Sequence, residues 1–249
     1  MTTFVLVHGG WHGGWCWRRV TPLLAGHELH IPTLTGLGDR AHLARPDTGL
    51  ADHVEDVVAV LELDDLRDVV LVGHSSGGAV ITGVAQRCPD RLSELVYIDA
   101  FPPAPGQSVF DLLPAVRREH FLRLVDASGR IVLDAEPAMD GWGLTDAADR
   151  EWVRPRLRPS PVGALRDPLP LDPVPELPRR YVHCTVKPGG DSFAGFAAAA
   201  RTDPTWDFAT LATGHDAMIT APEALATLLS ARCQQSHVAD THATLPSDP

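Results

Sequence analysis

The sequence is poor in lysine and in long apolar runs. Lys187 is its single lysine, and 21 basic against 32 acidic residues give a formal charge of −11 at pH 7. Proteins that bind nucleic acids neutralise phosphates with clustered Lys and Arg, so this balance argues against a nucleic-acid partner. No apolar run approaches the roughly 20 residues that cross a bilayer, and no signal-peptide pattern precedes Phe4. We therefore expect a cytoplasmic protein that does not associate with membranes.

Metal-binding and redox motifs are also missing. The four cysteines form no Cys-x-x-Cys pair, and the twelve histidines are dispersed without a His-Glu-x-x-His spacing. Zinc sites and redox centres need such clustering. We expect neither a metal ion nor an organic cofactor. A chain of 249 residues can also bury one large core without disulfides.

The chain does contain short apolar runs that alternate with amphipathic segments. Continuous apolar runs are typical of strands buried on both faces of a parallel sheet. These runs are Phe4–Val7, Leu29–Leu34, Val69–Val72, Leu95–Ile98 and Tyr181–Thr185, with a weaker, alternating one at Thr205–Leu211. Helical periodicity occupies Val54–Leu61, Ser76–Arg87, Ser192–Ala200 and Pro222–Arg232. This alternation predicts an α/β fold with a doubly wound, mostly parallel sheet.

Residues 101–178 interrupt the alternation. The stretch is rich in proline and too long for a plain loop, so we interpret it as a cap inserted over the sheet. Residues 236–249 contain only two large apolar side chains, Val238 and Leu245, which predicts a disordered tail. We therefore expect one domain over residues 1–235, with the cap insertion at about 101–178.

The pentapeptide Gly73-His74-Ser75-Ser76-Gly77 lies between an apolar run and an amphipathic helix. A sharp strand-to-helix turn of this kind forces its central residue into strained dihedrals and exposes it at the C-terminal edge of the sheet. The helix dipole at this place favours a developing negative charge. The context predicts that Ser75 is a nucleophile.

A serine hydroxyl needs a base to take its proton, and in this architecture the base follows the last strand. His215, in Gly214-His215-Asp216, occupies that place, whereas the other histidines after Ser75 fall in the cap, inside a strand or in the tail. A tetrahedral oxyanion also needs two N–H donors. We assign them to Gly10, in the loop after the first strand, and to Ser76.

These three motifs resemble the α/β-hydrolase superfamily, in the branch of plant methylesterases and hydroxynitrile lyases. The resemblance covers roughly residues 2–100 and 179–235, and it implies the fold and the catalytic machinery but not the substrate. Hydroxynitrile lyases of this branch carry a threonine after the first-strand histidine and a lysine after the catalytic histidine. This chain has Gly9 and Asp216 there, so the resemblance favours an esterase over a lyase.

The acid that orients the histidine is the part of the resemblance that fails. Relatives carry it in a Cys-Thr-x-Asp pattern, whereas this chain reads Cys184-Thr185-Val186-Lys187. Asp99 ends the preceding strand, a place where some haloalkane dehalogenases of the superfamily carry their acid. Asp191 follows two glycines and could turn back toward His215. We favour Asp99 because a strand end is a rigid support, and Asp191, or no acid at all, stays an alternative.

Aromatic residues suggest an apolar substrate pocket, for which we select Trp11, Phe101 and Trp142. The chain is expected to be a serine hydrolase that cleaves an ester, lactone or thioester of a small organic molecule through an acyl-enzyme. Two alternatives stay open: a cofactor-free lyase or cyclase that uses Ser75 and His215 for proton transfer, and a small-molecule receptor on the same fold. The expected partner is a small molecule, and a homodimer is compatible with the sequence.

Overall fold

A computed structural model describes the backbone of residues 1–240 and the side chains of residues 1–231. Its main sheet has six strands in the order β2-β1-β3-β4-β7-β8, and all neighbouring pairs are parallel. The strands are β1 (Thr3–Val7), β2 (Glu28–His30), β3 (Val69–His74), β4 (Leu92–Ile98), β7 (Arg179–Cys184) and β8 (Trp206–Leu211). The doubly wound α/β fold expected from the sequence is confirmed.

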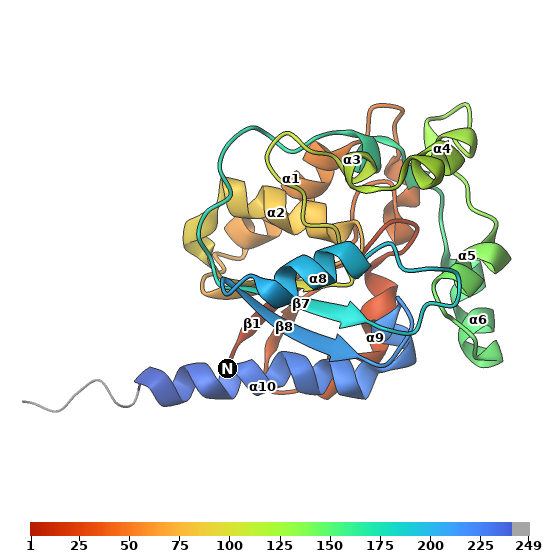
Figure 1. Cartoon of the computed structure of the whole chain (residues 1–249). Helices are drawn as coiled ribbons and strands as arrows, with labels where there is room; N and C mark the ends of the chain where they lie inside the picture. Colours follow the sequence, from red (N-terminus) through yellow and green to blue (C-terminus); the bar gives the residue numbers. More distant parts are fainter. Residues whose placement is uncertain (241–249) are drawn as a thin grey trace, which may run out of the picture.

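Helices cover both faces of the sheet (Figure 1). One face carries α1 (Leu50–Leu63), α2 (Gly77–Arg87) and α8 (Ala194–Thr202), and the other carries α9 (Ala217–Thr220) and α10 (Pro222–Asp240). Each face has its own apolar cluster: Val57, Ile81 and Ala197 belong to the first, and Trp17 and Leu225 to the second. Because both faces are buried, the central strands are apolar throughout, which explains why their runs were visible in the sequence.

The cap lies between β4 and β7, beside the C-terminal ends of the strands (Figure 1). Its elements are α3 (Val109–Leu112), α4 (Ala115–Arg123), β5 (Arg130–Ile131), α5 (Ala135–Gly141), α6 (Ala147–Val153), β6 (Ser160–Pro161) and α7 (Gly163–Arg166), with β5 and β6 paired antiparallel. The remaining short segments are the 3₁₀-helices η1 (Gly14–Arg19), η2 (Thr21–Leu24), η3 (Gly38–Leu43), η4 (Pro89–Arg91) and η5 (Arg154–Arg156).

Two sequence-based boundaries were wrong. The strand expected over Leu29–Leu34 ends at His30, because Pro32 has no N–H with which to continue a ladder. The tail expected from residue 236 is helical as far as Asp240, since α10 continues there; residues 241–249 lie outside the described residues.

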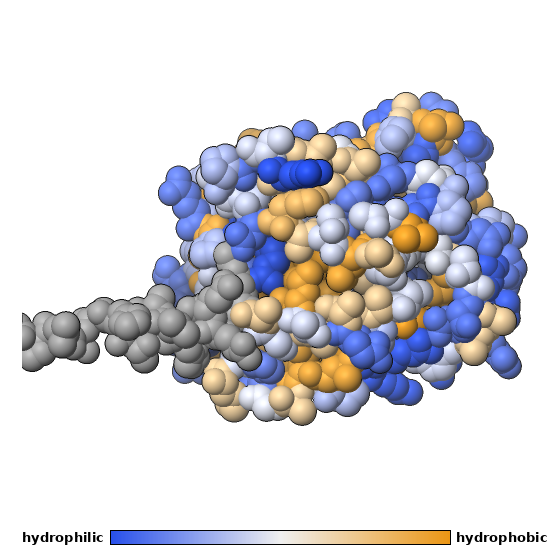
Figure 2. Space-filling view, turned by 60° about the horizontal axis from the view of Figure 1, so that its bottom comes forward, coloured by the Kyte–Doolittle hydropathy of each residue, from blue (hydrophilic) through white to orange (hydrophobic). Residues whose placement is uncertain are grey.

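The surface mixes hydrophilic and apolar residues. Seen from the side of α10, orange groups are interrupted by blue ones (Figure 2). No helix within residues 1–240 is long and apolar enough to cross a membrane.

Candidate active site

Ser75 occupies a strained turn at the C-terminal edge of the sheet. It lies between β3 and α2 with a φ of 56°, in the left-handed region that non-glycine residues rarely adopt. A Cβ on Gly73 would lie 2.7 Å from the carbonyl oxygen of Gly77, so the turn requires glycine at this position. The turn presents Ser75 next to the N-terminus of α2, where the sequence analysis expected it.

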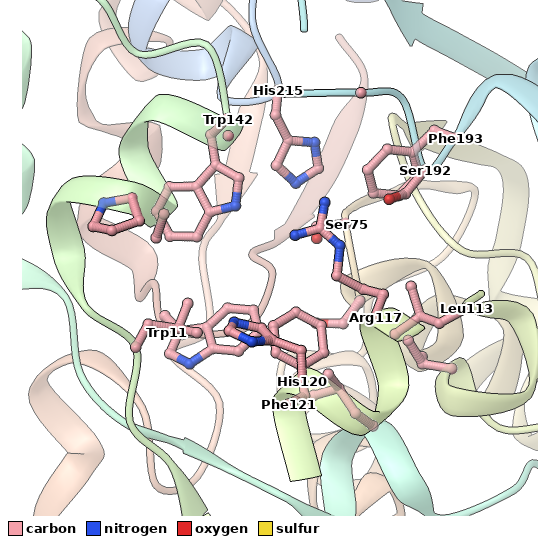
Figure 3. Close-up of a pocket in the computed structure, with 18 of the residues that line it drawn as sticks. Trp11, Ser75, Leu113, Arg117, His120, Phe121, Trp142, Ser192, Phe193 and His215 are labelled. Carbon is pink, nitrogen blue, oxygen red and sulfur yellow. The ribbon is translucent and has the colours of Figure 1, made fainter. Parts of the chain in front are cut away.

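His215 lies in the loop after β8, and its backbone N–H donates to the Trp142 carbonyl at 2.7 Å. Its imidazole and Ser75 line the same cavity (Figure 3). Within the part of the chain whose side chains the structure describes, no hydrogen bond joins the Ser75 hydroxyl to the His215 imidazole. Catalytic hydrogen bonds of this kind often tighten only when substrate binds.

Asp99 is the carboxylate that contacts His215. It directly follows β4, is fully buried and has a φ of 44°. The His215 Nδ1 lies 2.6 Å from Asp99 Oδ2. A proton on Nδ1 is donated to this carboxylate, which leaves Nε2 unprotonated for the serine side of the ring.

Asp191, the alternative acid, has different partners. Its carboxylate lies 2.7 Å from His183 Nε2, and it accepts from Lys187 Nζ at 2.7 Å and from the Phe193 N–H at 2.8 Å. It does not contact His215. Burial would raise the pKa of Asp191, but these hydrogen bonds together lower it, and the one from Lys187 contributes most among them. Of the two carboxylates that the sequence offered, the structure brings only Asp99 to the histidine.

Lys187 also belongs to the site, which the sequence did not reveal. Its ammonium donates 2.6 Å to Asp99 Oδ1, while the Cys184 N–H donates to the same oxygen at 3.3 Å. The lysine side chain is only 4% exposed. The signal was present: the single lysine of the chain stands where relatives carry an acid, close in sequence to one of the two candidate carboxylates.

The two residues assigned as oxyanion donors contact each other. The Gly10 N–H donates to Ser76 Oγ at 2.8 Å. One of the two N–H groups expected to bind the oxyanion is therefore already hydrogen-bonded to the Ser76 side chain. Ser76 directly precedes α2, and its own N–H belongs to the group at a helix start that has no acceptor within the helix.

A second buried cluster lies behind His215. Asp216 Oδ2 is 3.4 Å from His12 Nε2, and Oδ1 is 3.7 Å from His74 Nε2. Burial would raise the pKa of Asp216, but the interactions with His12, His74 and His215 together outweigh burial and lower that pKa to about 2. Burial would likewise lower the pKa of His12, but the interactions with Asp216 and Gly10 together raise it. Burial, followed by repulsion from His215, holds the pKa of His74 well below its usual value, so His74 is neutral and donates from Nε2 to the His215 carbonyl at 3.1 Å.

Within residues 1–231, two groups of residues have the spacing of metal ligands: His74, His215 and Asp216, and Asp99, His183 and Asp191. In the second group the Lys187 ammonium already lies between the two carboxylates. In the first group, His74 Nε2 is directed to the His215 carbonyl, and His215 Nδ1 is directed to Asp99. Because the Lys187 ammonium and these hydrogen bonds already engage part of each group, we assign no metal to either.

The cap closes an aromatic cavity of about 290 Å³ over Ser75 and His215. Trp11, Phe101 and Trp142, the three pocket residues selected from the sequence, all line it. Trp11 is fixed by a 3.0 Å bond from Nε1 to the Ile131 carbonyl. Residues of α4 and of the loop before α8 also line the cavity, and the sequence did not reveal this for Arg117, His120, Ser192 and Phe193 (Figure 3).

The wound parallel sheet, the strained serine and the histidine–carboxylate pair together define an α/β-hydrolase. Residues 4–228 match the Alpha/beta hydrolase family, and the chain belongs to that family.

Similarity to esterases extends over nearly the whole chain. The carbendazim hydrolyzing esterase of Nocardioides sp. strain SG-4G is 38% identical over 240 residues, which cover 93% of this chain and 99% of the esterase. The pyrethroid hydrolase of Sphingobium wenxiniae is 38% identical over 110 residues, 43% of this chain and 38% of the hydrolase. An extracellular α/β-hydrolase from a Paenibacillus species, described as sharing structural and functional homology with tobacco salicylic acid binding protein 2, matches with a TM-score of 0.83 at 29% identity, covering 93% of this chain and 98% of its own.

Proposed function

We propose that this protein is a serine esterase that acts on a small organic ester, with Ser75, His215 and Asp99 as its catalytic residues. The observation that carries the proposal is the 2.6 Å contact between His215 Nδ1 and Asp99, beside a serine held in a strained turn in the same cavity. A carboxylate at Nδ1 fixes the tautomer that can accept a proton at Nε2. This is the arrangement that activates a serine hydroxyl.

Acylation would begin with attack of Ser75 Oγ on the ester carbonyl. The hydroxyl proton moves to His215 Nε2, and the carbonyl oxygen becomes an oxyanion. When the intermediate collapses, the bond to the alcohol oxygen breaks and that oxygen takes the proton from Nε2. Water then attacks the acyl-enzyme, His215 takes one of its protons, and Ser75 Oγ recovers that proton as the acid leaves.

Stabilisation of the oxyanion is assigned to the N–H groups of Gly10 and Ser76. Since the Ser76 hydroxyl accepts the Gly10 N–H at 2.8 Å, that side chain must move when the oxyanion forms. Rotation about a single side-chain bond is enough to move the hydroxyl away. The aromatic lining of the cavity suits an apolar or aromatic ester, and relatives are named for hydrolysis of carbendazim and pyrethroids.

A cofactor-free lyase or cyclase fits this site less well. A Cβ at Gly9 would lie 2.7 Å from the Ser75 Cβ, so there is no room for the threonine that the lyases carry. The lysine of the lyases is replaced by Asp216, which is buried. A receptor without chemistry would have no need for the Asp99–His215 contact. The cytoplasmic location and the homodimer stay predictions from the sequence.

The nucleophile is tested by intact mass spectrometry after treatment with a fluorophosphonate. One adduct is expected on the wild type and none on Ser75→Ala. Failure to label the wild type, under conditions that inactivate a control esterase, would refute the assignment.

Hydrolysis is tested by turnover of p-nitrophenyl acetate and butyrate, which Ser75→Ala and His215→Ala should each abolish. Reaction in ¹⁸O-labelled water separates hydrolysis from rearrangement. Hydrolysis through the acyl-enzyme places ¹⁸O in the product acid, and a product acid without label would refute the proposed function.

A further inference from the structure

Arg117 brings a positive charge into the otherwise aromatic cavity. It comes from α4 of the cap, is partly buried, and lines the cavity together with Ser75 and His215. Figure 3 shows its guanidinium directed into the cavity, on the side of Ser75 and His215 in this view. His120, one helical turn further along α4, lines the same wall.

The guanidinium has no carboxylate partner. Among residues 1–231, whose side chains the structure describes, none forms an ion pair or hydrogen bond with Arg117. The other charged groups of the cavity wall are engaged elsewhere: Lys187 bridges Asp99 and Asp191, and Asp134 accepts the Glu136 N–H at the start of α5. A cation that loses part of its hydration without gaining an anion is unfavourable, and an anionic ligand would relieve this cost.

The position distinguishes Arg117 from the other arginines of the cap. Arg130 pairs with Asp126, and Arg150 and Arg154 both pair with Glu136. Arg118 and Arg123 share α4 with Arg117 but do not line the cavity. Arg117 is therefore the arginine of the cavity wall, and its planar guanidinium can bind a carboxylate through two parallel hydrogen bonds.

We infer that the natural substrate is an ester that carries a second, free carboxylate, a monoester of a dicarboxylic acid, and that Arg117 binds this carboxylate. The inference rests on the proposed esterase function and deepens it. The ester carbonyl lies at Ser75, the apolar body of the substrate packs among the aromatic residues of the wall, and the carboxylate lies under α4. Arg117 then acts as a specificity-determining residue that favours acidic over neutral esters.

The test compares two esters that differ in a single group. Monomethyl terephthalate carries a carboxylate where methyl 4-methylbenzoate carries a methyl group. The measured quantity is the ratio of kcat/KM for the acidic ester to that for the neutral ester. A hydrogen bond to a charged group contributes about 1.5–3 kcal/mol, or about tenfold to a hundredfold, so Arg117→Met should lower the ratio by at least about tenfold.

Two further variants separate recognition from a general effect of charge or of α4 stability. Arg118→Met removes the same charge from the next position of α4, outside the cavity, and should leave the ratio unchanged. Arg117→Lys keeps the charge without the planar guanidinium and should restore part of the ratio. An equal fall of the ratio in Arg117→Met and Arg118→Met would overturn the inference.

Failure of the inference and failure of the proposed function give different results. If the wild type hydrolyses the neutral ester and Arg117→Met does not change the ratio, the esterase stands and the carboxylate subsite is refuted. If the wild type hydrolyses neither ester, binding of monomethyl terephthalate to Ser75→Ala is measured by calorimetry. Binding at least tenfold weaker in Ser75→Ala/Arg117→Met would support the carboxylate subsite; equal binding, or none, would overturn it.

Discussion

The ammonium of Lys187 donates a 2.6 Å hydrogen bond to Asp99, the carboxylate that also contacts His215. This lysine stands where relatives of the methylesterase branch carry their acid. Asp99 directly follows β4, Lys187 lies shortly after β7, and these two strands pair side by side, with Ile98 opposite Val182. The carboxyl ends of both strands therefore meet at one edge of the sheet, and an acid on either strand can reach the same histidine.

Asp99→Asn tests which carboxylate orients the histidine. Loss of the charge at His215 Nδ1 removes the required tautomer, and kcat should fall on the scale of about 10⁴. The matched control is Asp191→Asn, whose carboxylate contacts His183 and Lys187 but not His215; its kcat should fall less than about tenfold. Steady-state kinetics on one aryl ester checks both variants, and a larger loss in Asp191→Asn would reverse the assignment.

Lys187→Met should lower the stability of the protein. Removing one partner of a buried ion pair costs about 3–5 kcal/mol of unfolding free energy, and both side chains here are almost completely buried. Urea unfolding measures the loss. A loss below about 1 kcal/mol, the value of an exposed ion pair, would show that the Lys187–Asp99 pair does not stabilise the fold.

The sequence pointed to Ser75 and His215, which the structure brings into one cavity, because their signals are local. Ser75 lies in a glycine-flanked turn between a strand and a helix, and His215 follows the last strand. Each needs only a few neighbouring residues to be recognised. The choice between Asp99 and Asp191 was different, because it depends on where two separate chain segments place their carboxylates in space. The structure places Asp99, and not Asp191, against His215, because β4 pairs with β7 and Asp191 contacts Lys187 and His183 instead.

Cap residues were harder to predict, for a related reason. Helices α3 to α7 are at most nine residues long, too short for a clear apolar periodicity. Arg117 was therefore indistinguishable from Arg118 in the sequence, although only one of them lines the cavity. The Ser76–Gly10 contact was equally invisible, since it joins loops 66 residues apart.

Gly9→Ala tests how closely the first loop approaches the nucleophile. The new Cβ would lie 2.7 Å from Ser75 Cβ, and the strained turn leaves Ser75 little freedom to move. A displacement of about 1 Å can cost about a hundredfold in rate, so we expect a loss of that order. Gly10→Ala is the matched control, because its Cβ meets nothing closer than 3.4 Å and should lose less than tenfold. Similar losses in both variants would contradict the steric argument.

His8 should make the protein less stable in mild acid. Its Nε2 accepts the Leu34 N–H at 3.1 Å and its Nδ1 lies 2.8 Å from the Gly9 carbonyl, an arrangement that suits the neutral ring. Burial lowers the pKa of His8 from 6.5 to about 3. The unfolded chain therefore binds this proton first, and the stability present above pH 6.5 is lost progressively between pH 6.5 and 3.

At pH 4.5 the loss from His8 alone should be about 2–3 kcal/mol. Burial also lowers the pKa of His53 and His74, which adds to the effect. Urea unfolding between pH 4.5 and 7.5 measures it. His8→Gln keeps an acceptor without the titration and should flatten the dependence, whereas His42→Gln, at an exposed position, should not. An equal slope in wild type and His8→Gln would contradict this account.

Ser76→Ala should make the enzyme faster. In the structure the Ser76 hydroxyl accepts the Gly10 N–H at 2.8 Å, so an oxyanion must displace it before it can use that donor. An intramolecular hydrogen bond contributes about 0.5–1.5 kcal/mol net, and its removal should raise kcat/KM by about twofold to tenfold.

The control is Ser160→Ala. The Ser160 hydroxyl also lies near Gly10, 3.4 Å from the place that a Cβ on Gly10 would take. It is buried, but it has no hydrogen-bond partner among the described residues. That variant should stay within about twofold of the wild type, since no donor is released. A fall of tenfold or more in Ser76→Ala would mean that the hydroxyl itself donates to the oxyanion, because loss of one such donor costs about a hundredfold or more.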